Sequence, residues 1–235
     1  MLAGCCTPAT SKLASQLVNS RLAPTSVQRV QGLESLEFRD RLGRRLIRCV
    51  IGLSLFAIGI SLQMNANIGA PPWDVFHQGV AKQTGISIGK VIVITGFALL
   101  LLWIPLKQKP GLGTILNALE IGLVADVALA IIPEPTNILI RVPMALLGIV
   151  VVAIGTGLYI GSALGPGPRD GLMTGLAKRG IPIRKGRTAV EVIVLITGWL
   201  LGGQVGIATF AFALGVGPLV HFFLPRLAIK KLLVN

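Results

Sequence analysis

Charged residues are scarce in this chain, and their scarcity argues against a water-soluble protein. Only 13% of the 235 residues are charged, whereas 53% are hydrophobic. Soluble domains carry about 25% charged residues. Because so few polar groups cannot cover a water-soluble globule, the composition predicts a membrane protein.

Several motifs of soluble enzymes are also missing. The sequence has no Walker A loop, no dinucleotide-binding glycine pattern, no His-Glu-x-x-His zinc motif and no Gly-x-Ser-x-Gly elbow. Cys5, Cys6 and Cys49 are not spaced for a metal site or a disulfide framework, and no cleavable signal peptide is predicted. No pair of nucleophile and base is visible either. We therefore expect no cofactor, no metal and no enzymatic activity.

The apolar residues form long blocks, which indicates transmembrane helices. A helix needs roughly 20 apolar residues to cross the hydrocarbon core, and continuous rather than alternating blocks favour helices over strands. The fold class predicted is an all-α integral membrane protein with about six transmembrane helices. The expected spans are residues 46–66, 91–106, 112–132, 142–163, 189–201 and 207–224. The second and fifth are short and could extend at either end.

The distribution of basic residues predicts the topology. The net charge is +13, but the basic residues flank apolar blocks, which argues against nucleic-acid binding. With six spans, the outside loops contain only Lys82, Lys90 and Arg141, whereas the inside loops contain sixteen basic residues. The other three lie in the amino-terminal tail. The positive-inside rule then places both termini in the cytoplasm. Residues 1–38 are predicted to be a loosely ordered cytoplasmic tail, and residues 229–235 a second cytoplasmic tail.

An internal repeat divides the membrane part into two halves. When residues 52–82 are shifted by 96 positions, eleven of the 31 positions are identical. The predicted repeats are residues 39–140 and 141–228, each with three spans. Because three is odd, the second repeat should be inverted in the membrane. Inverted repeats with Gly/Pro-broken segments at matching places are typical of secondary transporters, although channels and structural membrane proteins also contain them.

Matching breaks occur in the two repeats. Gly-Ala-Pro-Pro-Trp-Asp at residues 69–74 corresponds to Gly-Pro-Gly-Pro-Arg-Asp at residues 165–170. Glycine and proline end the preceding helix. The segments that follow, 73–82 and 169–178, are too short and polar to cross a bilayer. They are predicted to be kinked loops that dip into the membrane from opposite faces.

The residues at these breaks have two readings. Asp74 and Asp170 could simply cap a helix start, where the positive helix end favours an acidic side chain. Alternatively, they could line a binding site for a small solute. Arg169 could pair with Asp170 or bind an anionic substrate, and Trp73 could be an interfacial anchor.

Ionisable residues inside the spans are further candidates, because their burial in lipid is costly. Glu120 lies deep in the third span and is the best candidate for ion coupling. Asp126 and His221 occupy equivalent positions in the two repeats and could form a proton relay. They could also be solvated residues near the ends of their spans.

Three stretches carry a resemblance to a known family. Residues 67–75, 110–117 and 165–173 resemble the bacterial YczE/YyaS/YitT-type multi-pass membrane proteins, most closely the YczE-like branch. The resemblance covers roughly residues 43–227. It implies an uncharacterised protein of the bacterial cytoplasmic membrane and supplies no established binding residues.

The function expected is that of a small secondary transporter or permease-like protein. Its substrate or gate residues would be Trp73, Asp74, Arg169 and Asp170. The alternative is a non-transporting accessory protein that binds a partner or lipid. The expected partners are the lipid bilayer and a small solute, without nucleic acid. Gly157 and Gly161 form a small-xxx-small pair that would allow close helix packing within the chain or in a homo-oligomer.

Overall fold

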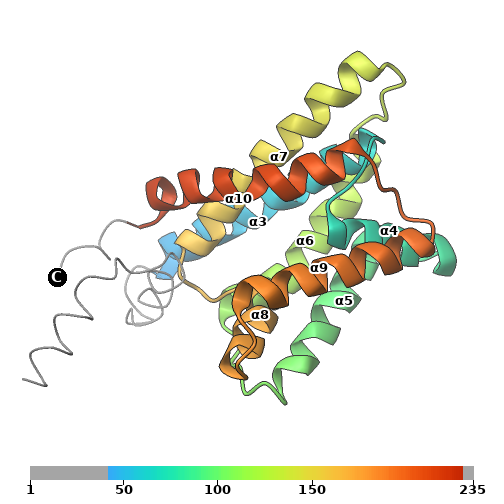
Figure 1. Ribbon diagram of the computed structural model, residues 1–235. Helices are drawn as coiled ribbons and strands as arrows, with labels where there is room; N and C mark the ends of the chain where they lie inside the picture. Colours follow the sequence, from blue (N-terminus) through green and yellow to red (C-terminus); the bar gives the residue numbers. More distant parts are fainter. Residues whose placement is uncertain (1–41, 230–235) are drawn as a thin grey trace, which may run out of the picture. The chain divides into compact units, whose positions relative to one another are not determined.

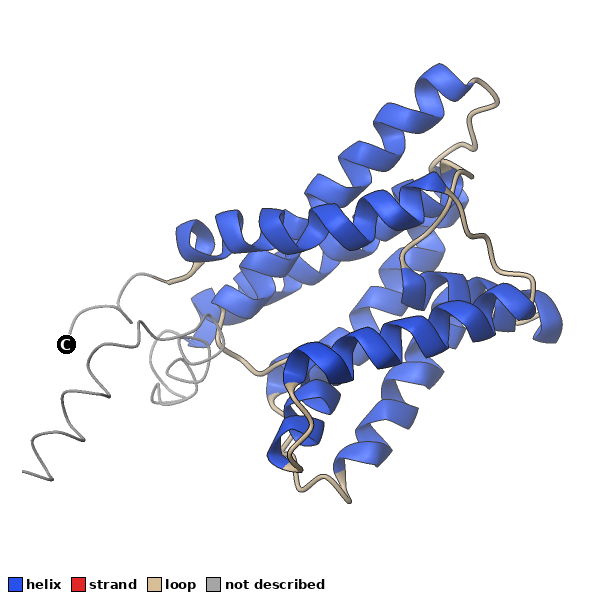
Figure 2. Ribbon diagram, viewed as in Figure 1, coloured by secondary structure: helices blue, strands red, loops and turns tan. Residues whose placement is uncertain are grey.

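A computed structural model describes residues 42–229 (Figure 1), and the regular structure in this range is helical throughout (Figure 2). The helices are α3 (Leu42–Asn65), α4 (Pro72–Thr84), α5 (Ile88–Trp103), α6 (Leu112–Ile131), α7 (Ile138–Gly161), α8 (Pro168–Lys178), α9 (Ile183–Leu200) and α10 (Ile207–Leu227). The predicted all-α fold is confirmed. The predicted tail at residues 1–38 and residues 230–235 lie outside the described range. The two repeats, now α3–α6 and α7–α10 in helix order, stay predictions.

Four of these helices are long and apolar enough to cross a membrane, namely α3, α6, α7 and α10. Helices α4 and α5 meet this test only together, as a pair bent by 114°, so that the described residues contain up to five such spans. Helix α9 begins six residues earlier than its predicted span and contains Arg184, Lys185, Arg187 and Glu191. These charges lower its apolarity, so the sixth span stays a prediction.

Helices α3 and α7, which correspond in the repeat, pack along each other in opposite directions. A methyl group on Gly52 would lie 2.8 Å from the carbonyl oxygen of Gly155, and one on Gly59 would lie 2.8 Å from that of Gly148. Only glycine allows the two backbones to approach so closely. The later residue of α3 thus meets the earlier residue of α7, which means that the two helices are antiparallel.

The predicted small-xxx-small pair packs within the chain. A methyl group on Gly157 would lie 3.1 Å from Leu227 Cδ1, and one on Gly161 would lie 2.9 Å from Ala228 Cα. The pair therefore brings α7 against the end of α10, so no second copy of the chain is needed to explain it.

Each Gly/Pro break docks on the other half of the chain. The Ile68 carbonyl accepts a hydrogen bond from Ala208 N at the start of α10 (3.1 Å), and the Leu164 carbonyl accepts one from Gly113 N at the start of α6 (2.8 Å). Gly69 and Gly165 both have a φ of 121°, which a side chain rarely tolerates. The two breaks thus have the same backbone shape, and each one packs on a helix of the other half.

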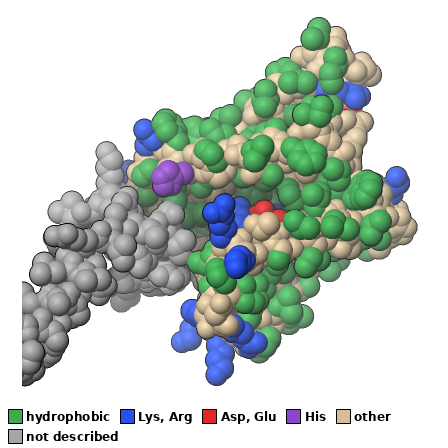
Figure 3. Space-filling view, in the orientation of Figure 1, with side chains coloured by type: hydrophobic (Ala, Val, Ile, Leu, Met, Phe, Trp, Pro, Cys, Tyr) green, Lys and Arg blue, Asp and Glu red, His purple; other side chains and the backbone are tan. Residues whose placement is uncertain are grey.

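The packing of the last two helices differs between the halves. Helix α5 lies against α6, where a methyl group on Gly89 would be 2.1 Å from the Gly122 carbonyl oxygen. Helix α9 instead packs along α4 and lies apart from α10 (Figure 1). The space-filling view shows a recess between α9 and α10 with acidic and basic side chains at its edge (Figure 3). The pseudo-symmetry is therefore broken in the packing of α5 and α9.

Candidate functional site

Helix α4 carries a buried carboxylate and a buried imidazole on one face. The backbone N–H of Asp74 bonds the Pro71 carbonyl (2.8 Å), which starts the helix directly after the break. His77 follows three residues later, so both side chains face the same way. Their Oδ1 and Nδ1 atoms are 3.1 Å apart, and neither residue has measurable solvent exposure.

The Asp74 carboxylate does not cap its helix. The start of α4 has no side-chain capping bond, and neither has the start of α8, where Asp170 lies. Asp170 instead accepts a hydrogen bond from the Tyr159 hydroxyl at 2.8 Å. The helix dipole still favours both aspartates, but their polar contacts are with side chains. The capping interpretation therefore explains neither carboxylate.

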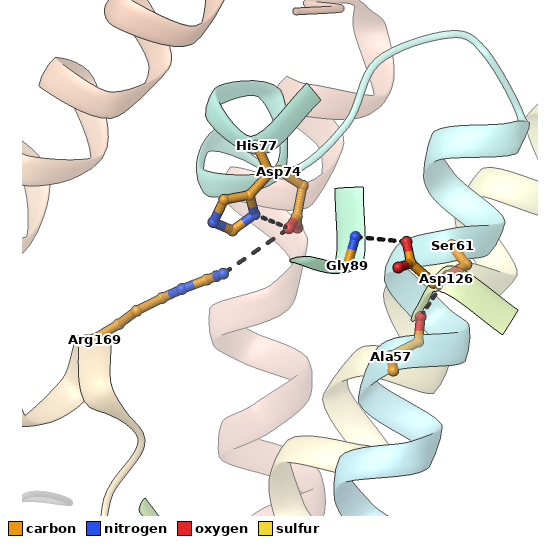
Figure 4. A network of polar contacts seen from close by, with 7 residues as sticks. All are labelled: Ala57, Ser61, Asp74, His77, Gly89, Asp126 and Arg169. Atoms are coloured by element: carbon orange, nitrogen blue, oxygen red, sulfur yellow. Dashed lines mark hydrogen bonds and ion pairs between the residues drawn. The ribbon is translucent and has the colours of Figure 1, made fainter. Parts of the chain in front are cut away.

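Arg169 of α8 crosses from the second half to the first (Figure 4). Its Nη2 atom lies 3.9 Å from Asp74 Oδ1, and its guanidinium carbon lies 4.9 Å from the centre of the Trp73 ring. A separation of 3.9 Å is too long for a hydrogen bond, so this is a loose ion pair supported by a cation–π contact. The Arg169 side chain is 28% exposed, so part of its surface is not covered by other residues.

Arg169 lies between carboxylates of both halves. Asp74, Asp170 and Glu191 all act electrostatically on its guanidinium. Glu191 is held on α9 by Arg187 at 2.8 Å. Within the described residues, Arg169 forms its ion pair with Asp74, in the opposite half. The prediction that Arg169 pairs with its neighbour Asp170 is therefore replaced by a contact between the repeats.

Two buried polar atoms of this cluster lack a hydrogen-bond partner. They are Asp74 Oδ2 and His77 Nε2. Most buried polar atoms in proteins are paired, and each unpaired one calls for an explanation. A site that binds a proton or a polar solute supplies that explanation. The described residues contain no group of three His, Cys, Asp or Glu side chains that could hold a metal ion.

Residues 43–225 match a family of unknown function (DUF6198). The chain belongs to this family. It is also similar to an uncharacterised protein of Haemophilus influenzae, at 40% identity over 76% of this chain and 83% of the relative.

Two relatives come from Bacillus subtilis. The uncharacterised membrane protein YczE is 32% identical over 74% of this chain and 83% of its own length, and the uncharacterised protein YyaS is 28% identical over 74% and 90%. No solved structure matches the chain significantly. The resemblance predicted from the three sequence stretches is confirmed, and so is the prediction of a membrane protein.

The other predicted residues of this DUF6198 protein lie outside the cluster. Glu120 of α6 accepts a hydrogen bond from Ser54 at 2.8 Å. Asp126 accepts hydrogen bonds from Gly89 N (2.6 Å) and Ser87 Oγ (2.7 Å), and so caps the start of α5. The Glu120 carboxylate thus forms a hydrogen bond between α3 and α6, and Asp126 has a structural role at the α5–α6 contact.

Asp126 and His221 are not brought together. Asp126 lies near the end of α6 whose Ile132 carbonyl is bonded by Asn65. His221 is exposed near the end of α10 whose Leu227 carbonyl is bonded by Arg48. Because Asn65 and Arg48 belong to opposite ends of α3, a direct proton relay between the two residues has no support in this arrangement.

Two residues of the cluster were not predicted. His77 follows Asp74 by three positions in a segment expected to be helical, and this spacing could have revealed it. Tyr159 is the one tyrosine of the sequence and lies in a glycine-rich span. Its contact with Asp170 depends on the turn at residues 162–167, and no sequence pattern gives the course of that turn.

Proposed function

We propose that this protein is a small secondary transporter of the bacterial cytoplasmic membrane. It would cross the membrane six times as two inverted repeats, with both termini in the cytoplasm. The observation that carries the proposal is the Asp74–Arg169 pair, which joins the two Gly/Pro breaks at 3.9 Å. Broken helices from two inverted repeats form the solute site in many transporters. The antiparallel contact of α3 with α7 and the bias of basic loops support this topology.

The asymmetry between the halves supports an alternating cycle. On the predicted outer side, Asp126 bonds the start of α5 and holds it against α6. In the second half, no described residue of α10 after Val216 is buried, and α9 packs along α4 rather than along α10. Within the proposal, this arrangement represents one of the two states of the cycle. Exchanging the packing of the two halves would produce the opposite state.

Arg169 is the residue through which a solute would act on both halves. A solute carboxylate could replace Asp74 at the guanidinium, because the existing ion pair is loose and the arginine is partly exposed. The accessory-protein alternative gives no reason for a charge pair at the junction of the breaks. We retain the proposal that the protein is not an enzyme, and its substrate would be a small solute.

Sided cysteine labelling tests the topology on which this function rests. Cys5 and Cys6 are changed to serine and Cys49 to alanine, and single cysteines then replace Lys82 or Lys178. These lysines are equivalent and exposed, at the ends of α4 and α8. A membrane-impermeant maleimide should label position 82 from outside and position 178 only after the inner face is opened. Labelling of both from one side would refute the inversion and favour an accessory protein.

A flux assay tests transport itself. Proteoliposomes containing the purified protein would be given radiolabelled small carboxylates, amino acids and sugars, with a proton gradient imposed. Arg169→Gln should abolish uptake of the transported solute. Lys178→Gln also removes one positive charge, but outside the cluster, and should leave uptake unchanged. Equal uptake by both variants and by empty vesicles would refute the proposal for these solutes.

A further inference from the structure

We infer that Asp74 and His77 form the proton-binding site that couples solute movement to protons, with Arg169 as the group that responds. The binding of the proton stands on its own, and the coupling step rests on the proposed transport function. This inference moves the coupling site from Glu120, the residue favoured by the sequence, to the short helix α4.

The geometry identifies the atom that takes the proton. An ionised carboxylate can only accept hydrogen bonds, so the Nδ1 atom that faces Asp74 Oδ1 at 3.1 Å must carry the hydrogen. The neutral imidazole then has its lone pair on Nε2, the buried atom that has no partner. A proton arriving at the site binds Nε2 and turns the imidazole into an imidazolium. No other bond is made or broken.

The charge of the pair changes at this step. Before protonation, Asp74 and neutral His77 together carry one negative charge, which attracts Arg169. After protonation, the pair is neutral overall and the imidazolium repels the guanidinium. The 3.9 Å contact between Arg169 and Asp74 therefore belongs to the deprotonated state.

Arg169 has alternative partners in its own half. Asp170 and Glu191 already act on its guanidinium, and a released Arg169 would turn toward them or toward a solute anion. Because Asp74 belongs to α4 and Asp170 to α8, this exchange changes the attraction between the two halves. Proton binding in one half would thus alter the contact between both.

The other charged groups near α4 are not in contact with the pair. On α9, Arg187 and Glu191 bond each other. Lys90 of α5 and Lys82 of α4 are exposed. Arg169 is therefore the charged neighbour whose removal should change the proton affinity of the pair most.

The second half cannot provide an equivalent proton site. The repeat aligns His77 with Met173, which is buried and does not titrate. Trp73 and Asp74 align with Arg169 and Asp170. The two breaks have thus diverged into complementary parts, a proton acceptor in the first half and a cation in the second. We expect one proton to be bound per chain.

Nitrogen NMR of histidine tests this site. His77 and His221 are the two histidines of the chain, so the variant His221→Gln, labelled with ¹⁵N-histidine in nanodiscs of phosphatidylethanolamine and phosphatidylglycerol, gives signals from His77 alone. With rising acidity, its Nε2 signal should change from an unprotonated to a protonated nitrogen. Asp74→Asn should lower the proton affinity by about tenfold or more, because an opposite charge in contact has effects of this size.

Arg169→Gln should change the proton affinity of His77 in the opposite direction, because it removes a competing positive charge. Glu120→Gln is the matched control and should leave the titration unchanged. A purely structural His77 would show the same titration in the Arg169 variant as in its parent, or no titration between about pH 5 and pH 9, around the ordinary histidine pKa of about 6.5. Either result would overturn the inference. If Asp74→Asn does not fold, the Arg169 variant decides the matter.

This experiment also separates the two proposals. A titration that responds to Arg169, together with the absence of flux for all the solutes tested, would leave the proton site standing and refute transport of these solutes. Flux that depends on Arg169, with an unresponsive His77, would leave transport standing and refute the proton site.

Discussion

Gly171 of α8 is the position at which one added methyl group should do the most damage near the site. A methyl group there would lie 1.8 Å from Trp103 Cζ2 and 2.4 Å from Cη2. An ordinary carbon contact is about 3.5 Å, so the indole ring would have to move by well over an ångström. The ring is 2% exposed and its Nε1 donates a hydrogen bond to the Pro168 carbonyl at 3.0 Å. Gly171→Ala therefore creates a steric clash between α8 and a buried indole ring that has no room to move.

The cost of this change follows from three contributions. Overpacking a well-packed core costs about 1–3 kcal/mol. Losing the buried Trp103–Pro168 hydrogen bond adds about 1–3 kcal/mol, and the higher helix propensity of alanine returns about 1 kcal/mol. Gly171→Ala should therefore lower the free energy of unfolding by about 1–5 kcal/mol.

Reversible unfolding in mixed detergent micelles measures this loss. Gly215→Ala is the control, because a methyl group at Gly215 in α10 would lie at an ordinary contact distance of 3.9 Å from Ile149 Cγ2. This control should be neutral or stabilising by up to about 1 kcal/mol. If the two variants differ by less than about 0.5 kcal/mol, the close contact between α8 and Trp103 is refuted.

Three further predictions concern the helix ends and the remaining carboxylate. Asp126→Ala removes the carboxylate at the start of α5 and should destabilise the protein by about 2–3 kcal/mol. Amide hydrogen exchange at Gly89 should also become faster, and unchanged exchange would contradict the hydrogen bond from Gly89 N to Asp126. Gly165→Ala should cost about 1–3 kcal/mol in unfolding free energy, because its φ of 121° is strained for alanine, and a wild-type stability would refute the shape of the second break. Glu120→Gln should change stability by less than about 1 kcal/mol, because the amide oxygen can still accept from Ser54; a larger loss in the same unfolding assay would mean that its charge is needed for folding.

The helices could be predicted from the sequence because lipid imposes simple rules on length and apolarity. The third span was expected at residues 112–132 and α6 is Leu112–Ile131, while the expected sixth span at 207–224 corresponds to α10. The short segments after the breaks were also expected, because proline and glycine signal where a helix must stop. Boundaries moved most at α9, whose charged first turns gave no apolar signal.

The contacts between distant segments could not be predicted in the same way. The repeat placed Asp74 and Asp170 at equivalent positions, but symmetry alone would have kept them in equivalent surroundings. The structure instead brings Arg169 to Asp74 and Tyr159 to Asp170, because the two breaks carry different side chains. His77 was missed because the repeat comparison favours identical residues, whereas here the chemistry lies in the residues that differ.

The exchanged docking of the breaks has a consequence for biosynthesis. The second break meets the start of α6, which has already been made when residues 163–167 leave the ribosome. The first break must wait for the start of α10, and its contact between Asn67 and Gln204 spans 137 residues of chain. The first half is thus inserted early but completed late, and the helix with Asp74 and His77 reaches its final surroundings only after the start of α10 has been synthesised.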